Sequence, residues 1–441
     1  MRRFLPLALF AIVLALSGAA PAGAVTVEKV VSPGGIEAWL VEDHSNPIID
    51  MEVAFRGGAS VEPARLPGLA YMASGLLDEG AGPYDSQTFQ GKLEDMAIEL
   101  SFEAGKDNFR GHLKTITDHR DTAFDLFRLA LTKPRFDAEP VARIRSQILA
   151  VLAREQQSPD AVAALAWFKA AFPGHPYGVP TRGTPQTVKA ITTADLKTYV
   201  ARHLARDNLV VGVTGDITPA QLGPLLDSTF GKLPAKAEAV TVPDVTPKAP
   251  GRIDVITRDN PQSTAMFGQA GLKRDDPDWY AGYVMNYILG GGGFSSWLTE
   301  EVREKRGLAY SVYSYLEPLR HAGLIIGGVA TRNAEMGQSL ALIRDQWKRM
   351  RDQGPTPQEL ADAKTYLVGS FPLNLDSTTS IAELLVTIQV EHLGIDYLDR
   401  RAGLINAVSM ADVRRVANRL LDPAALEFVV VGKPQGVTPA P

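Results

Sequence analysis

Two segments that lie 217 residues apart in the chain resemble each other, and this repeat constrains the fold more than any other feature of the sequence. Residues 191–215 read ITTADLKTYVARHLARDNLVVGVTG, and residues 408–432 read VSMADVRRVANRLLDPAALEFVVVG. Each pattern predicts a short amphipathic helix followed by an apolar strand that ends in glycine. Identical positions include Ala194 and Ala411, Asp195 and Asp412, Arg202 and Arg419, and Gly215 and Gly432.

Other elements repeat in the same order. The alternating strands DMEVAFRGG (50–58) and STAMFGQAG (263–271) each precede a helical pattern, GLAYMASGLLDEG (68–80) and WYAGYVMNYILGG (279–291). A duplicated unit of roughly 200 residues, a typical domain size, accounts for this order. Strands followed by runs of helices, rather than strict alternation, favour an α+β fold of two homologous domains, each a largely antiparallel sheet flanked by helices.

The stretch 233–251 predicts the boundary between the two domains. It reads LPAKAEAVTVPDVTPKAPG, is rich in Pro, Ala and Val, and lacks helical periodicity, as an extended linker does. We therefore expect an N-terminal domain over 25–232 and a C-terminal domain over 252–441.

The first 24 residues have the pattern of a secretory signal peptide. Arg2 and Arg3 precede an apolar stretch, and Ala22-Gly23-Ala24 forms an A-x-A site that predicts cleavage after Ala24. No other apolar run approaches about 18 residues, so we expect no membrane span. Export together with the absence of cysteine from the sequence suggests a bacterial periplasm.

Several classes of function lack their usual sequence signals. The formal net charge of −5 and the absence of clustered Lys and Arg argue against a nucleic-acid partner. Thiol catalysis is excluded without cysteine, and there is no G-x-S-x-G or Walker A motif. The seven histidines form no HxxxH, HxH or HExxH pair that would offer zinc two imidazoles on one helix face.

A glycine run opens the most informative part of the sequence. Gly290, Gly291, Gly292 and Gly293 in GGGGFSS lack the G-x-G-x-x-G register after a strand, so nucleotide binding is poorly supported. We interpret the run as a flexible turn before a helix, with a hinge role.

The segment SSWLTEEVREKRGLAYSVYSYLEP (295–318) predicts a helix that ends near Gly307 and a following strand. Alternation in that strand predicts Tyr310 and Val312 on the same face. This geometry brings Arg303 near Tyr310, and a guanidinium beside a phenol suits the binding of a peptide carbonyl. The other interpretation is an arginine favoured by the helix dipole and a tyrosine packed on a sheet.

The sequence GGGGFSSWLTEEVREKRGLAYSVYS (290–314) closely resembles the C-terminal domain motif of the pitrilysin/insulinase-type zinc metallopeptidases, which include the mitochondrial processing peptidases. The resemblance runs through nearly all of the chain after residue 24 and includes the duplication, the linker and FPGHPYG (172–178). It implies a clamshell half built from two domains. It also implies that Arg303 and Tyr310, seven residues apart, bind substrate opposite a zinc site.

The same resemblance locates an inverted zinc motif, H-x-x-E-H, that has degenerated here. The two histidine positions fall on Tyr71 and Gly75, the general-base position on Ser74, and the third ligand position on Val151. None of these residues ligates zinc well. We therefore expect no catalytic residue, metal or other cofactor in this chain.

The resemblance, together with the loss of the zinc motif, implies a non-catalytic, substrate-binding subunit of a heterodimeric periplasmic zinc peptidase, inactive alone. A homologous partner subunit would hold the zinc, and this chain would supply Arg303 and Tyr310 to peptide substrates. An inactive scaffold or peptide-binding protein of the same fold is the alternative. An autonomous metallopeptidase with improvised ligands is a third, for which the sequence shows no ligand spacing.

Overall fold

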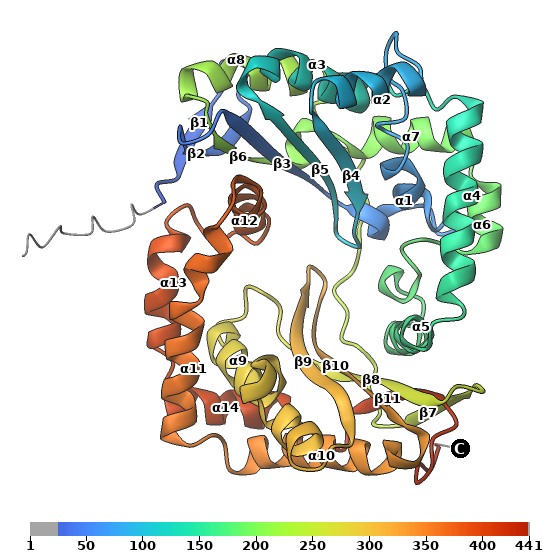
Figure 1. Ribbon diagram of the computed structural model, residues 1–441, viewed down its shortest axis with the longest axis vertical. Coiled ribbons are helices and arrows are strands. Elements are labelled where there is room, and N and C mark those ends of the chain that lie inside the picture. Colours follow the sequence, from blue (N-terminus) through green and yellow to red (C-terminus); the bar gives the residue numbers. More distant parts are fainter. Residues whose placement is uncertain (1–24, 440–441) are drawn as a thin grey trace, which may run out of the picture.

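The computed structural model describes residues 25–439, which form two sheets flanked by helices (Figure 1). The first sheet has six strands in the order β1-β2-β6-β3-β5-β4, and the second has five in the order β7-β11-β8-β10-β9. Pairing is antiparallel except between β2 and β6 and between β7 and β11. The predicted α+β class with two largely antiparallel sheets is confirmed. The strands are β1 Glu28–Val31, β2 Glu37–Glu42, β3 Ile48–Arg56, β4 Glu99–Ala104, β5 Asn108–Ile116, β6 Leu209–Gly215, β7 Ile253–Thr257, β8 Gln262–Ala270, β9 Ala309–Leu319, β10 Ala322–Arg332 and β11 Glu427–Gly432.

The α-helices divide between the two halves of the chain at the segment 233–251, which carries no helix or strand. In the first half they are α1 Leu69–Ser74, α2 Ser86–Asp95, α3 Arg120–Thr132, α4 Ala138–Glu155, α5 Pro159–Ala171, α6 Pro185–Ala190, α7 Thr193–His203 and α8 Pro219–Phe230. In the second half they are α9 Trp279–Asn286, α10 Met336–Asp352, α11 Pro357–Gly369, α12 Thr378–Val390, α13 Tyr397–Asn406 and α14 Met410–Leu420. None of the helices described is both long and apolar enough to cross a membrane.

The repeated sequence segments form α7 with β6 and α14 with β11. In each copy the aspartate is the third residue of the helix and forms a capping box with the N-cap residue: Asp195 pairs with Thr192, and Asp412 with Ser409. The closing glycine of each copy has a positive φ, +129° at Gly215 and +144° at the equivalent strand end. A side chain there would be strained. The two copies therefore share the residues that are needed to start the helix and to end the strand.

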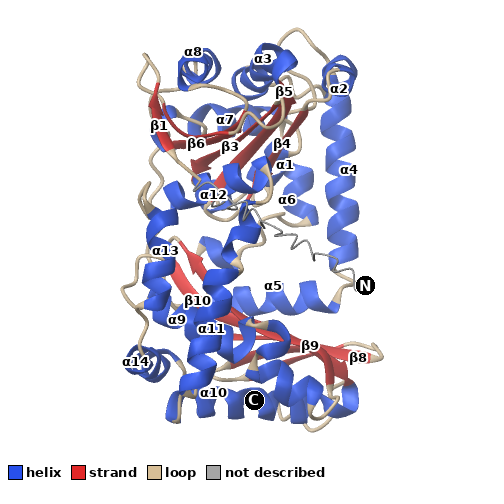
Figure 2. Cartoon of the chain, turned by 60° about the vertical axis from the view of Figure 1, so that its left-hand side comes forward, coloured by secondary structure: helices blue, strands red, loops and turns tan. Residues whose placement is uncertain are grey.

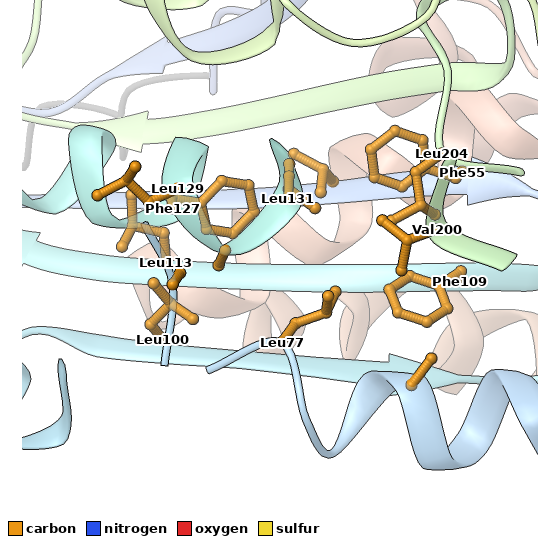
Figure 3. Close-up of a cluster of buried hydrophobic side chains, with 14 of the residues drawn as sticks. Phe55, Leu77, Leu100, Phe109, Leu113, Phe127, Leu129, Leu131, Val200 and Leu204 are labelled. Atoms are coloured by element: carbon orange, nitrogen blue, oxygen red, sulfur yellow. The ribbon is translucent and has the colours of Figure 1, made fainter. Parts of the chain in front are cut away.

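A hydrophobic core fills the space between the first sheet and the helices on its outer face (Figure 3). Phe109 and Leu113 of β5 and Phe127 and Leu131 of α3 are fully buried in this core, where the Phe109 ring lies 6.1 Å from that of Tyr199 of α7. The alternation of buried and half-buried residues along β5 supplies this face. Apolar burial of this kind is the main stabilising term of the half.

The opposite face of each sheet is covered by a helix from the other half of the chain (Figures 1 and 2). The α12 helix of the second half packs on β3 and β6, and a side chain at Gly212 of β6 would approach the Ala382 carbonyl to 2.7 Å. The α5 helix of the first half packs on β8 and β11, where a Cβ atom at Gly268 would lie 2.8 Å from the Trp167 ring. The two halves thus exchange helices.

The segment 233–251 runs alongside both halves. The backbone N–H of Val245 donates to the His321 carbonyl at 2.8 Å, and that of Lys248 donates to the Ala171 carbonyl at 2.8 Å. The His175 side chain accepts from the N–H of Tyr177 and lies 3.0 Å from the Pro243 carbonyl through Nε2. The domain boundaries at 25–232 and 252–441 remain a prediction, and the signal peptide lies outside the described residues.

Candidate functional site

Arg303 and Tyr310 lie side by side, as their spacing suggested. Arg303 belongs to a π-helical turn, Thr299–Glu304, and its guanidinium carbon lies 4.9 Å from the centre of the Tyr310 ring. The same carbon lies 4.6 Å from the centre of the Phe294 ring, so both rings contact the cation. Sequence reasoning missed Phe294, whose one signal was an aromatic residue directly after a glycine run.

A β-bulge turns Tyr310 toward solvent. Ala309 pairs with Thr331 and Ser311 pairs with Ala330, which leaves Tyr310 without a partner on β10. The expected common face for Tyr310 and Val312 is therefore wrong: Tyr310 is 83% exposed, whereas Val312 is 4% exposed. An extra residue in one strand re-aims its side chain in this way.

The turn between the π-helical segment and β9 follows the sequence prediction. Gly307 has a φ of +61°, and its N–H donates to the Arg303 carbonyl at 2.7 Å. The N–H of Leu308 donates to the Val302 carbonyl at 3.0 Å. This left-handed C-terminal turn satisfies carbonyls that a helix end leaves free and fixes the approach of Arg303 to β9.

The four glycines before this turn differ in their surroundings. A side chain at Gly290 would lie 2.7 Å from Leu298 and 2.8 Å from the backbone of Ser314. Gly293 has a φ of +56° and open space around it. Gly290 is thus required by close packing on β9 and Gly293 by backbone conformation. The hinge role of Gly290–Gly293 remains a prediction.

The degenerate zinc-motif positions lie on α1 and α4. Tyr71 and Ser74 are in α1, Gly75 follows its last residue, and Val151 is in α4. The Ser74 hydroxyl donates to the Tyr71 carbonyl at 2.9 Å, and a side chain at Gly75 would face Ile144 of α4 at 3.5 Å.

These side chains do not fit zinc. They offer a phenol and a hydroxyl but no imidazole, thiolate or carboxylate, and the hydroxyl is used within its own helix. Over residues 25–439, no group of three His, Asp or Glu side chains is placed to hold a metal ion.

A guanidinium lies beside the first of these positions. The guanidinium carbon of Arg182 is 5.2 Å from the centre of the Tyr71 ring, and Arg182 forms an ion pair with Glu155, one helical turn after Val151. The Tyr71 phenol and the Glu155 carboxylate raise the pKa of Arg182, although burial opposes them. Tyr71, Glu155 and Arg182 line a cavity of about 350 Å³ together with Leu165 of α5. No local sequence pattern predicts this pairing, because Arg182 is remote from α1 along the chain.

Comparison with known proteins agrees with this geometry. Residues 38–185 match the family described as "Insulinase (Peptidase family M16)", and residues 190–367 match "Peptidase M16 inactive domain". A crystal structure of a peptidase M16 inactive domain from Pseudomonas fluorescens is 30% identical, with a TM-score of 0.87, over 94% of this chain and 100% of that one.

The chain belongs to peptidase family M16. It is 28% identical to the "Non-peptidase homolog YmxG" of Helicobacter pylori, over 94% of both chains. It is 27% identical to an uncharacterized zinc protease of Streptomyces coelicolor, over 90% of this chain and 87% of that one. This M16 chain therefore combines the family fold and a match to the inactive domain with motif positions that do not fit zinc.

Proposed function

We propose that this M16 chain is the non-catalytic, substrate-binding subunit of an exported heterodimeric peptidase. Its homologous partner would hold the zinc, and this chain would contribute Arg303 and Tyr310. The observation that carries the proposal is the presentation of a guanidinium and a phenol together at the surface, beside Phe294. A scaffold alone has no need of that pair.

The proposed pair suits a peptide carbonyl. The Arg303 guanidinium has several N–H donors and the Tyr310 hydroxyl has one more, so both can donate to one carbonyl oxygen. Donors that are held in position before the reaction stabilise the negative charge that develops on such an oxygen. The contacts with Phe294 and the turn at Gly307 hold Arg303 in that position.

Peptide cleavage by the mature chain, with and without a zinc-bearing M16 subunit from the same organism, tests the proposal. We expect hydrolysis only in the mixture. Arg303→Ala in the mixture should lower kcat/KM by about ten- to a hundredfold, because a hydrogen bond to a charged group contributes about 1.5–3 kcal/mol. Arg332→Ala, which removes an exposed arginine paired with Glu335, is the matched control and should leave the rate unchanged.

Two results would reject this role: hydrolysis by the chain alone, or an unchanged rate for Arg303→Ala in an assembled complex. Binding of the partner without hydrolysis would favour the second candidate, an inactive scaffold or peptide-binding protein. The similarity to a protein named as a non-peptidase homolog supports that candidate.

Export is part of the proposal. The residues before Val25 have the features of a signal peptide, and N-terminal sequencing of the protein recovered from a periplasmic fraction should begin at Val25. A cytoplasmic chain that keeps residues 1–24 would contradict it.

A further inference from the structure

A cavity of about 640 Å³ lies where the two halves of the chain meet, away from the Arg303–Tyr310 pair. Arg56 at the end of β3 lines it from the first half. Arg320 in the turn between β9 and β10, and His392 after the end of α12, line it from the second half. The three residues come from separate elements that meet only because the halves are folded together.

Arg56 is half-buried, whereas Arg320 is exposed. The Arg56 Nε atom is buried and has no hydrogen-bond partner. Among residues 25–439, no carboxylate oxygen lies within 4.0 Å of a side-chain nitrogen of Arg56 or Arg320. Burial and the nearby Arg320 lower the pKa of Arg56, and burial, Arg56 and Arg320 lower the pKa of His392. Groups that can carry positive charge are thus crowded together.

The backbone at His392 closes the end of α12. Its φ of +54° lies in the left-handed region, as is common for the residue after a helix C-cap. The N–H groups of His392 and Leu393 donate to the Gln389 and Ile388 carbonyls at 3.2 and 3.0 Å. The conformation holds the imidazole at the cavity wall beside Arg56 and Arg320.

Two of the six acidic residues that line the same cavity, Asp107 and Asp244, are engaged by other groups. Asp107 accepts from the Tyr177 hydroxyl at 2.6 Å and from the backbone N–H of Arg320 at 3.0 Å. Asp244 pairs with Lys273 at 3.0 Å and with His321 at 2.9 Å. Burial raises the pKa of Glu317 and of Glu391. The remaining acidic residues of the lining are Glu103 and Asp275.

We propose that this cavity binds an oxyanion, a carboxylate or a phosphate, between the guanidiniums of Arg56 and Arg320, with His392 as a third donor. Guanidinium groups bind both anions through charge-assisted, often bidentate hydrogen bonds. An anion there would supply the missing partner of Arg56. It would also connect the two halves, because Arg56 comes from one and Arg320 and His392 from the other. The site is independent of the role proposed for Arg303 and Tyr310.

Calorimetric titration of the mature chain with inorganic phosphate, and with a decapeptide bearing a free or an amidated C-terminus, tests the proposal. Sodium chloride at equal ionic strength is the salt control, because nonspecific charge effects are screened alike. We expect saturable binding of phosphate, of the free-carboxylate peptide, or of both, and none of the amidated peptide. The phosphate and peptide arms distinguish the two sources of the oxyanion. Bound anion should also raise Tm, by an amount that increases with the logarithm of the anion concentration above Kd.

Arg320→Gln should weaken that binding at least about tenfold, because it removes a charged donor. Arg320 is exposed, so the variant should fold. In anion-free buffer its Tm should equal or exceed that of the wild type, since a like charge beside Arg56 has been removed. Arg65→Gln, which removes an exposed arginine paired with Asp195, is the matched control and should bind as the wild type does. Absence of saturable binding in every arm, or equal affinity for wild type and Arg320→Gln, would overturn the proposal.

Discussion

The polar side chains of the α1–α4 region bond within the fold, whereas those at the start of β9 face solvent. At α1, the Ser74 hydroxyl donates within its helix and the Tyr71 ring lies against Arg182, which is itself paired with Glu155. At β9, a bulge directs Tyr310 to solvent beside Arg303. The first region uses its polar groups to hold the fold together. At β9, Arg303 pairs with Glu304 through Nε at 3.3 Å, which leaves its other nitrogens and the hydroxyl of the exposed Tyr310 available to another molecule. This difference favours recognition of a ligand at β9.

Replacing one glycine by alanine in each region tests this comparison. The replacement near β9 should have the largest effect on stability. Gly290→Ala should lower the free energy of unfolding by about 1–3 kcal/mol, because its methyl group would overlap Leu298 and the Ser314 backbone. Gly75→Ala should be neutral or slightly stabilising, since the nearest atom outside its own turn is 3.5 Å away. Urea denaturation of both variants measures the difference. Equal destabilisation would show that α1 is packed as tightly as the β9 turn.

The two regions should contribute to the free energy of unfolding with different pH dependences. Glu62 accepts hydrogen bonds from the backbone N–H groups of Ala70 and Gly68 at the start of α1, and burial raises its pKa from 4.5 to about 8. Its folded pKa exceeds its unfolded pKa, so the folded state binds the proton more tightly. Its contribution to the free energy of unfolding is constant below about pH 4.5, falls between about 4.5 and 8, and is constant above that range.

Glu62→Gln should remove that fall, as denaturation measured from pH 4 to pH 9 would show. Near β9, hydrogen bonds from Lys305 and Arg306 lower the pKa of Glu301. A lowered folded pKa contributes stability that is present above the unfolded pKa and is lost as pH decreases through the folded one. Glu301→Gln should therefore change the profile only in the acid range. A Glu62→Gln profile with the wild-type slope above pH 5 would contradict the assignment.

The smallest expected effect concerns Phe294, which contacts the face of the Arg303 guanidinium. Phe294→Ala should lower kcat/KM of the mixed complex by about two- to fivefold, because an exposed cation–π contact contributes about 0.5–1 kcal/mol. Tyr366→Ala, which removes another exposed aromatic side chain, stacked on Tyr287, is the control. A loss as large as that of Arg303→Ala would indicate that Phe294 contacts the substrate itself.

The features that the sequence predicted correctly are those that depend on short-range patterns. The repeated helix and strand, the turn at Gly307 and the proximity of Arg303 to Tyr310 all depend on residues close together in the chain. Strand alternation failed at Tyr310, because a bulge depends on pairing with β10 and leaves no period in the sequence. The contact of Arg182 with Tyr71 depends on the tertiary fold, so no local pattern reveals it.

The exchange of α5 and α12 has a consequence for how the duplicated halves can be separated. Each half alone would expose the apolar sheet face that the other half's helix covers, together with its own unpaired helix. Two such fragments, produced by cleavage between residues 233 and 251, would bind each other and restore the complete fold, as the fragments of a split reporter protein do. Two intact chains could trade the same helices, so that the contact that joins the halves of one molecule also offers a route to a domain-swapped dimer.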